Sequence, residues 1–262
     1  MVLTVVAIFG FYVIFSFVQR NLIFVTNHTF SHSPQEYDWK YEEVWLDVAG
    51  EKTHGWFIPV DNARGVALFS HGNDSNISSN LGTVRWLRGL GFSTLLYDYG
   101  GYGESTGRPS EKRVYADGLA MWDYLVHQRH VPPEKILLYG VSFGGGATCD
   151  LASRVHCGAV ILDSTFLSIP DAAFERYPWF PGRWFIHHDF DNKSKMGKIS
   201  APLLVLHSRD DSLYPIRHGQ ELFALAPEPK YFQETQGDHG TSFEISKKLY
   251  EQSWSQFLAP LF

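Results

Sequence analysis

Ser142 stands at the centre of the pentapeptide GVSFG (residues 140–144), directly after an apolar run and before a stretch of small residues. A G-x-S-x-G sequence between a strand and a helix suits a nucleophilic serine, because the serine must occupy a sharp, strained turn and the flanking glycines leave room for it. A glycine-rich turn with a capping serine would carry the same letters. The pattern predicts a nucleophile if a base and an acid follow it along the chain.

A serine hydroxyl becomes a strong nucleophile only when a base takes its proton and an acid orients that base. In folds with this serine turn, the chain order is serine, acid, histidine. His239 follows the last apolar run, is flanked by glycines and is the expected base. The carboxylates that follow Ser142 at predicted strand ends are Asp163, Asp210 and Asp211. We favour Asp211 as the acid, with Asp210 as the rival.

Negative charge on a reacting carbonyl oxygen needs two backbone N–H donors. One is expected at Phe143, the residue after the nucleophile. The other is expected at Asn73, in the loop HGND (residues 71–74) that follows an apolar run. The alternative for this loop is an ordinary polar turn.

The elements that must position these residues are short apolar runs alternating with helical segments. The expected strands are Val44–Val48, Gly55–Pro59, Val66–Ser70, Ser93–Tyr97, Ile136–Val141, Ala159–Asp163, Leu203–His207 and Lys230–Glu234. The later runs are continuously apolar, as in parallel strands covered on both faces. Amphipathic helices are expected around residues 115–126 and 250–258, and a capping box at 241–244 marks the start of the last helix. The pattern predicts an α/β fold: a doubly wound, mostly parallel eight-stranded sheet with helices on both faces.

Composition excludes several classes of protein. Among 262 residues there are 22 Lys and Arg against 28 Asp and Glu, a net charge of −6 that disfavours nucleic-acid binding. Cys149 and Cys157 are too few for a disulfide scaffold or a cysteine zinc site, and we expect two buried thiols. The run HHDFD (residues 187–191) invites a metal site, but adjacent residues rarely point the same way. We expect no metal.

Residues 2–18 form an uncharged run of 17 residues whose only polar members are Thr4 and Ser16. As a helix it spans about 25 Å, just short of a bilayer core. No basic residue precedes it and no small-residue cleavage site is visible, so we favour an uncleaved single-pass membrane anchor at residues 1–20 over a signal peptide or a helix packed on the protein. The sequence does not specify the orientation of this anchor in the membrane, because the positive charges on its two sides are nearly balanced and the positive-inside rule favours neither orientation.

Six segments together resemble the α/β-hydrolase superfamily. They are SHGN (70–73), DYGGYGESTGRPSE (98–111), GVSFG (140–144), RYPWFP (176–181), SRDDSLYP (208–215) and GDH (237–239). The resemblance covers residues 40–262 and is to a membrane-anchored branch related to serine-aminopeptidase-type and monoglyceride-lipase-like domains. It implies Ser142, Asp211 and His239 as catalytic triad, Asn73 and Phe143 as oxyanion donors, and no cofactor. Ser208 departs from the pattern, which usually has Gly after His207, and this keeps Asp210 open.

Three functions follow as hypotheses. The first is a serine hydrolase that cleaves a small-molecule acyl ester or thioester at a membrane surface. The second is a serine aminopeptidase with the same triad, and the third is a non-catalytic membrane interaction protein on a hydrolase scaffold. A short cap insertion at residues 171–198 either lines an acyl pocket or forms its own core with its aromatic side chains: Phe174, Tyr177, Trp179, Phe180, Trp184 and Phe185.

Overall fold

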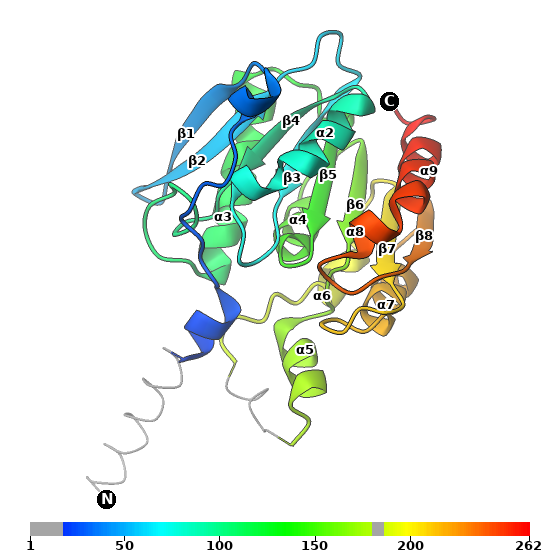
Figure 1. Ribbon diagram of the computed structural model, residues 1–262. Coiled ribbons are helices and arrows are strands. Elements are labelled where there is room, and N and C mark those ends of the chain that lie inside the picture. The colour runs from blue at the N-terminus through cyan, green and yellow to red at the C-terminus, as the bar shows by residue number, and fades with distance from the viewer. Residues whose placement is uncertain (1–17, 180–185) are drawn as a thin grey trace, which may run out of the picture.

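Eight strands form one sheet in the computed structural model, which describes residues 18–179 and 186–262 (Figure 1). The strand order is β1-β2-β4-β3-β5-β6-β7-β8. The strands are β1 (Glu42–Val48), β2 (Glu51–Ile58), β3 (Gly65–Ser70), β4 (Phe92–Tyr97), β5 (Ile136–Val141), β6 (Ala159–Asp163), β7 (Leu203–Ser208) and β8 (Lys230–Thr235). β2 runs antiparallel to both β1 and β4, and the other neighbouring pairs are parallel. The mostly parallel eight-stranded sheet predicted from the sequence is confirmed.

The largest difference in strand bounds is at β2, which begins at Glu51 rather than Gly55. Its first residues pair with the end of β1 across a tight hairpin, with Val48 opposite Glu51. Glu51 and Lys52 are exposed there, so no apolar signal marked them.

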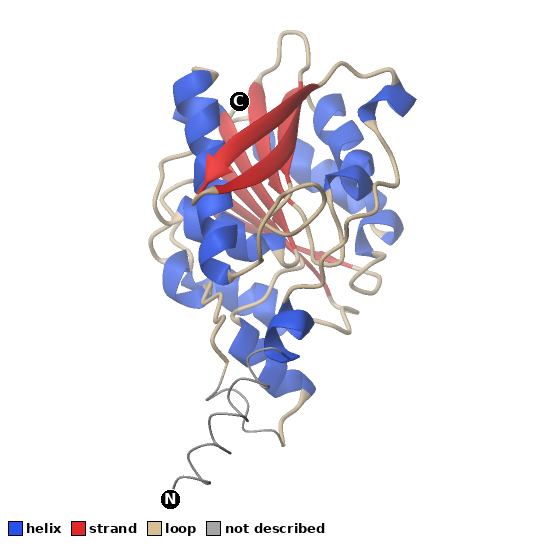
Figure 2. Cartoon of the chain, turned by 90° about the vertical axis from the view of Figure 1, so that its left-hand side faces the viewer, coloured by secondary structure: helices blue, strands red, loops and turns tan. Residues whose placement is uncertain are grey.

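Helices cover both faces of the sheet, as Figure 2 shows. The helices are α2 (Leu81–Gly89), α3 (Glu111–Asp123), α4 (Gly144–Ala152), α5 (Ile169–Arg176), α6 (Lys193–Met196), α7 (Arg217–Leu225), α8 (Ser242–Ile245) and α9 (Lys247–Leu258). Along β3, Val66 and Leu68 belong to the core that also contains residues of α3, α4 and α7. Ala67 and Phe69 belong to the core with α2 and α9. Successive strand side chains point to opposite faces, so continuously apolar strands require both layers of helices.

Short 3₁₀-helical turns and one π-helical turn in the described residues connect these elements. They are η1 (Pro34–Tyr37), η2 (Ile77–Asn80), η3 (Tyr124–Gln128) and η4 (Pro133–Lys135). η3 continues α3 and accounts for the C-terminal part of the helix expected around residues 115–126.

The capping box expected at residues 241–244 does not form. α8 does begin at Ser242, but the Thr241 side chain accepts no N–H from it. Thr241 has φ −125° and ψ −5°, outside the extended region usual for a capping residue, and its hydroxyl donates instead to the Asp238 carbonyl at 3.2 Å. The helix also breaks after Ile245 and resumes as α9.

The insertion predicted at residues 171–198 lies between β6 and β7 and includes most of α5 and all of α6. Three of its aromatic residues are exposed, Phe174 by 44%, Tyr177 by 51% and Trp179 by 79%. These three therefore do not form a buried cap core, while Phe180, Trp184 and Phe185 lie outside the described residues. Both cysteines are free and buried, as expected.

The expected membrane anchor falls almost entirely outside the described residues, since only its last part, from Val18, is included. Residues 18–23 are helical. Within residues 18–179 and 186–262, no helix has the length and apolar character needed to cross a bilayer.

Candidate active site

Ser142 occupies the turn between β5 and α4 with a left-handed backbone conformation, φ +52°. A Cβ on Gly144 would lie 2.0 Å from the Ser70 carbonyl oxygen, and one on Gly140 would lie 2.4 Å from the Thr148 hydroxyl, so the turn can close only with glycine at both positions. β6 holds the turn from the other side, because the Ser142 N–H donates to the Asp163 carbonyl at 2.8 Å. This strained turn places the Ser142 side chain, which is 8% exposed, at the carboxyl edge of the sheet.

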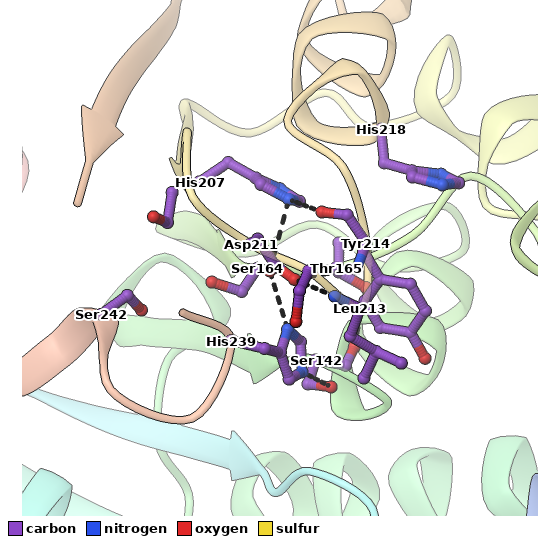
Figure 3. Close-up of polar contacts among 12 residues, drawn as sticks. Ser142, Ser164, Thr165, His207, Asp211, Leu213, Tyr214, His218, His239 and Ser242 are labelled. Atoms are coloured by element: carbon purple, nitrogen blue, oxygen red, sulfur yellow. Dashed lines mark hydrogen bonds and ion pairs between the residues drawn. The ribbon is translucent and has the colours of Figure 1, made fainter. Parts of the chain in front are cut away.

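His239 joins Ser142 to Asp211, as Figure 3 shows. Nε2 of His239 lies 2.8 Å from the Ser142 hydroxyl, and Nδ1 lies 2.7 Å from Oδ2 of Asp211. A carboxylate can only accept, so Nδ1 carries the proton and Nε2 is free to accept the serine proton. The edge of the Tyr214 ring packs against the imidazole with 5.1 Å between ring centroids.

The Asp211 carboxylate is oriented by its own loop. Oδ1 accepts the N–H groups of Leu213 at 2.9 Å and Tyr214 at 2.8 Å, which leaves Oδ2 for His239. His207, four residues earlier, lies 3.6 Å from Oδ2 and donates to the Tyr214 carbonyl at 2.7 Å. Burial lowers the pKa of His207, which keeps this neighbour neutral.

The other two candidate acids are engaged elsewhere. Asp210 is exposed, and its carboxylate accepts the Gly237 N–H at 3.1 Å. Asp163 is buried beneath the site and accepts the hydroxyls of Tyr250 at 2.8 Å and Tyr139 at 3.1 Å. Burial raises the pKa of Asp163 to about 6. Among the three carboxylates, the structure brings only Asp211 to His239.

Ser208 is a residue of this site whose role the sequence did not reveal. Its hydroxyl donates to the Gly237 carbonyl and accepts the Asp210 N–H at 3.1 Å. It therefore ties the loop that carries Asp211 to the loop that carries His239. The departure from glycine at this position was visible, but the contact it makes depends on two loops 29 residues apart meeting.

The two expected oxyanion donors lie on loops around Ser142. Phe143 follows the serine, and the loop of Asn73 lies against it, since a Cβ on Gly72 would lie 3.6 Å from the Ser142 Cβ. Within the described part of the chain, neither the Phe143 nor the Asn73 backbone N–H donates to a protein acceptor. The Asn73 carboxamide has other partners, described below.

Buried polar side chains support the Asn73 loop. His71 lies 3.3 Å from Oδ1 of Asp98, which also accepts the Ile77 N–H at 3.0 Å. Burial opposes the charge of Asp98, but its contacts with His54 and His71 outweigh burial and lower the pKa of this carboxyl. This role of Asp98 and His54 is not evident from the sequence, because only the pairing of β2 with β4 places His54 beside Asp98.

Comparison with known proteins identifies the family. A family model described as the alpha/beta hydrolase fold matches residues 67–194. The uncharacterized protein YfhR of Salmonella typhimurium is 34% identical over 232 residues, which cover 80% of this chain and 78% of YfhR. This chain belongs to the alpha/beta hydrolase family. Alpha/beta hydrolase domain-containing protein 17C of Xenopus tropicalis is another relative, 33% identical over 75% of this chain and 66% of that protein.

Solved structures share the fold of this alpha/beta hydrolase at low sequence identity. An esterase from Pyrococcus furiosus superposes with a TM-score of 0.75 at 17% identity, covering 90% of this chain and 98% of the esterase. An enol-lactonase from Burkholderia xenovorans superposes with a TM-score of 0.64 at 19% identity, covering 82% of this chain and all of that one. Family and fold together support hydrolytic activity in general.

Proposed function

We propose that this alpha/beta hydrolase is a serine hydrolase that cleaves an acyl ester or thioester through a covalent acyl-enzyme on Ser142. The observation that carries the proposal is the unbroken hydrogen-bond chain from the Ser142 hydroxyl through His239 to Asp211. A serine, an imidazole and a carboxylate in this order form a proton relay for acyl transfer on many unrelated folds.

In the proposed mechanism, Nε2 of His239 takes the hydroxyl proton as Ser142 attacks the substrate carbonyl. Asp211 keeps the imidazole in the required tautomer and stabilises the imidazolium that forms. The N–H groups of Phe143 and Asn73 stabilise the oxyanion, and protonated His239 then donates to the leaving alcohol or thiol. A water molecule activated by neutral His239 next attacks the acyl-enzyme and releases the acid.

An apolar acyl substrate is supported by the exposed aromatic residues of the cap, Phe174, Tyr177 and Trp179. The esterase and the enol-lactonase with the same fold are enzymes that, by name, act on acyl–oxygen bonds. We infer the same reaction class for this chain.

A serine aminopeptidase is the second candidate. A hollow of about 370 Å³ in the cap is lined by Asp171, Asp189 and Asp191, and such a site could bind a substrate amine. Lys193 lines the same hollow and binds Asp171 at 2.6 Å, which offsets part of its negative charge. This ion pair makes the ester or thioester the better candidate. The contact of all three relay groups argues against a non-catalytic interaction protein.

We also propose that residues 2–18 anchor the chain in a membrane. In Figure 1, residues 18–23 and α5 lie below the sheet, at the end toward which β5 and β7 point. An anchor leaving from this end would hold the site close to a lipid surface. Alkaline carbonate extraction of membranes tests it: the full chain should stay in the pellet, and a variant without residues 2–17 should be released.

Labelling with a fluorophosphonate probe tests the nucleophile. The full-length chain should label, and Ser142→Ala, with its backbone turn intact, should not. Equal labelling of both proteins would overturn the proposal. Rates on p-nitrophenyl esters of increasing acyl length, acyl thioesters and aminoacyl anilides then distinguish the substrate classes, and preferential cleavage of anilides would favour the aminopeptidase.

A further inference from the structure

Residues 23–25 lie beside the loop of Asn73, although 48 positions separate Val25 from Asn73. The Val25 N–H donates to the side-chain oxygen of Asn73 at 3.0 Å, and the Val25 carbonyl accepts the Asp74 N–H at 3.0 Å. The Asn73 amide nitrogen donates to the Ile23 carbonyl at 2.9 Å. Figure 1 shows the chain rising from the helical residues 18–23 past the loops at the lower edge of the sheet.

These bonds orient the Asn73 carboxamide completely. Its oxygen accepts from Val25 and from the Tyr102 hydroxyl at 2.7 Å, while its nitrogen donates to Ile23. Tyr102 is fully buried. The side chain of Asn73 therefore acts as an anchor for its own backbone, whose N–H is the proposed oxyanion donor.

The same segment packs against the second proposed donor. Phe24 is 4% exposed, and its ring meets the Phe143 ring edge-on with 5.8 Å between centroids. Phe143 also packs on Phe190 at 5.0 Å and Tyr99 at 5.7 Å. One short segment thus contacts both residues whose N–H groups are proposed to bind the oxyanion.

We propose that residues 23–25 form part of the oxyanion site, with Phe24 and the Asn73 carboxamide as positioning groups for the N–H donors of Phe143 and Asn73. This inference rests on the proposed serine hydrolase function. Oxyanion donors act only when they lie 2.7–3.1 Å from the developing charge, so a shift of about 1 Å forfeits much of their effect.

A chain shortened to the conventional domain, from residue 40 onward, would fold around an oxyanion loop that has lost its anchor. The inference predicts that such a protein would be a poor catalyst with Ser142, His239 and Asp211 all present.

The test uses the full-length chain in detergent with the variants Phe24→Ala and Asn73→Ala, each of which leaves every backbone N–H in place. Because an oxyanion donor supplies about 10²–10³-fold in kcat, we expect a partial loss of about 10–100-fold in kcat, with KM changed less than about threefold. Affinity for an alkyl boronic acid, which mimics the tetrahedral intermediate, should fall by the same factor as kcat/KM.

Three measurements distinguish a loss of oxyanion-donor positioning from a general loss of folded protein. His28→Ala removes a 2.8 Å contact of the same segment with the Gly103 carbonyl but touches neither donor, so it should keep kcat. Phe24→Met, which restores apolar volume against Phe143, should recover most of the loss. Endpoint fluorophosphonate labelling gives the fraction of intact sites, and kcat is expressed per intact site.

The inference is overturned if Phe24→Ala and Asn73→Ala keep kcat and boronate affinity within about threefold per intact site, or if His28→Ala loses as much as they do. Failure of the proposed function looks different: the unmodified full-length chain would then neither label nor turn over acyl esters, and the inference would fall with it.

Discussion

Nδ1 of His239 lies 2.7 Å from Oδ2 of Asp211, while the adjacent Asp210 turns away to accept the Gly237 N–H. Asp211→Asn should lower kcat on p-nitrophenyl acetate about 10³–10⁴-fold, because an amide stabilises the wrong imidazole tautomer. Asp210→Asn, the matched control on the same loop, should change kcat less than about threefold. The reverse ranking in steady-state kinetics would assign the acid to Asp210.

Gly144 allows the serine turn to pack against the end of β3, since a Cβ there would lie 2.0 Å from the Ser70 carbonyl oxygen. Gly144→Ala should therefore lower the free energy of unfolding by more than about 3 kcal/mol or prevent soluble expression. Gly82→Ala is the control: Gly82 is an exposed residue of α2 with no atom near its Cβ position, and the change should stabilise by up to about 1 kcal/mol. Urea denaturation measures the free energy of unfolding of both variants. Equal stability of the two would show that a Cβ at position 144 does not clash with the Ser70 carbonyl.

His218 should make the protein less stable in mild acid. Its side chain is buried, Nδ1 accepts the Leu167 N–H at 3.0 Å, and Nε2 lies 2.8 Å from Glu175. Burial, aided by the positive charge of Arg217, lowers the pKa of His218 to about 4. Between pH 6.5 and 4 the unfolded chain therefore binds a proton that the folded chain does not, and stability falls as pH falls by on the order of 2–3 kcal/mol.

His218→Asn tests this pH dependence, because an asparagine keeps an acceptor near Leu167 and does not titrate. The difference in unfolding free energy between the two proteins should favour the histidine at pH 7.5 and shrink steadily toward pH 4. A difference that stays constant over this range in urea titrations would exclude His218 as the source.

We expect Tyr250 to contribute to the free energy of unfolding and not to the reactivity of Ser142. Its hydroxyl donates to the buried carboxylate of Asp163 at 2.8 Å, and burial raises the pKa of Asp163 to about 6. Tyr250→Phe should lower the free energy of unfolding by about 1–3 kcal/mol at pH 8, and by less at pH 5, where the carboxyl is protonated in the folded state and needs no charge stabilisation.

The control for Tyr250 is Tyr231→Phe, since Tyr231 is 55% exposed and the change should alter neither stability nor activity. The rate of fluorophosphonate labelling should be the same in both variants, because the contacts of His239 with Ser142 and Asp211 are untouched. A large loss of labelling in folded Tyr250→Phe would show that Asp163 participates in the site.

Local patterns in the sequence were sufficient to predict most of the strands and the turn that carries Ser142. Largely apolar runs predicted β3 to β7 within a residue or so, because a parallel strand covered on both faces must be apolar along most of its length. The bounds of β8 were also predicted within a residue, although this edge strand is only partly apolar and only its last residue is buried. The GVSFG turn likewise depends on neighbours within the chain, with Gly140 and Gly144 as the local requirement. At the β1–β2 hairpin the signal was weaker, since Glu51 and Lys52 face solvent.

The sequence by itself determined the fold class and reduced the site to Ser142, His239 and a choice among three carboxylates. The sequence favoured Asp211 but left Asp210 open, because two adjacent residues of the same type differ only in the direction of their side chains. The tertiary structure places Asp211 against His239 and Asp210 against the Gly237 N–H. It also revealed that Ser208 links the loops of Asp211 and His239, that Asp98 stabilises the Asn73 loop, and that Phe24 packs against Phe143. None of these contacts follows from a local sequence pattern. Each of these contacts joins segments that are distant in the sequence and lie side by side at the carboxyl edge of the sheet. Strand order and packing determine such contacts, and spacing along the sequence does not.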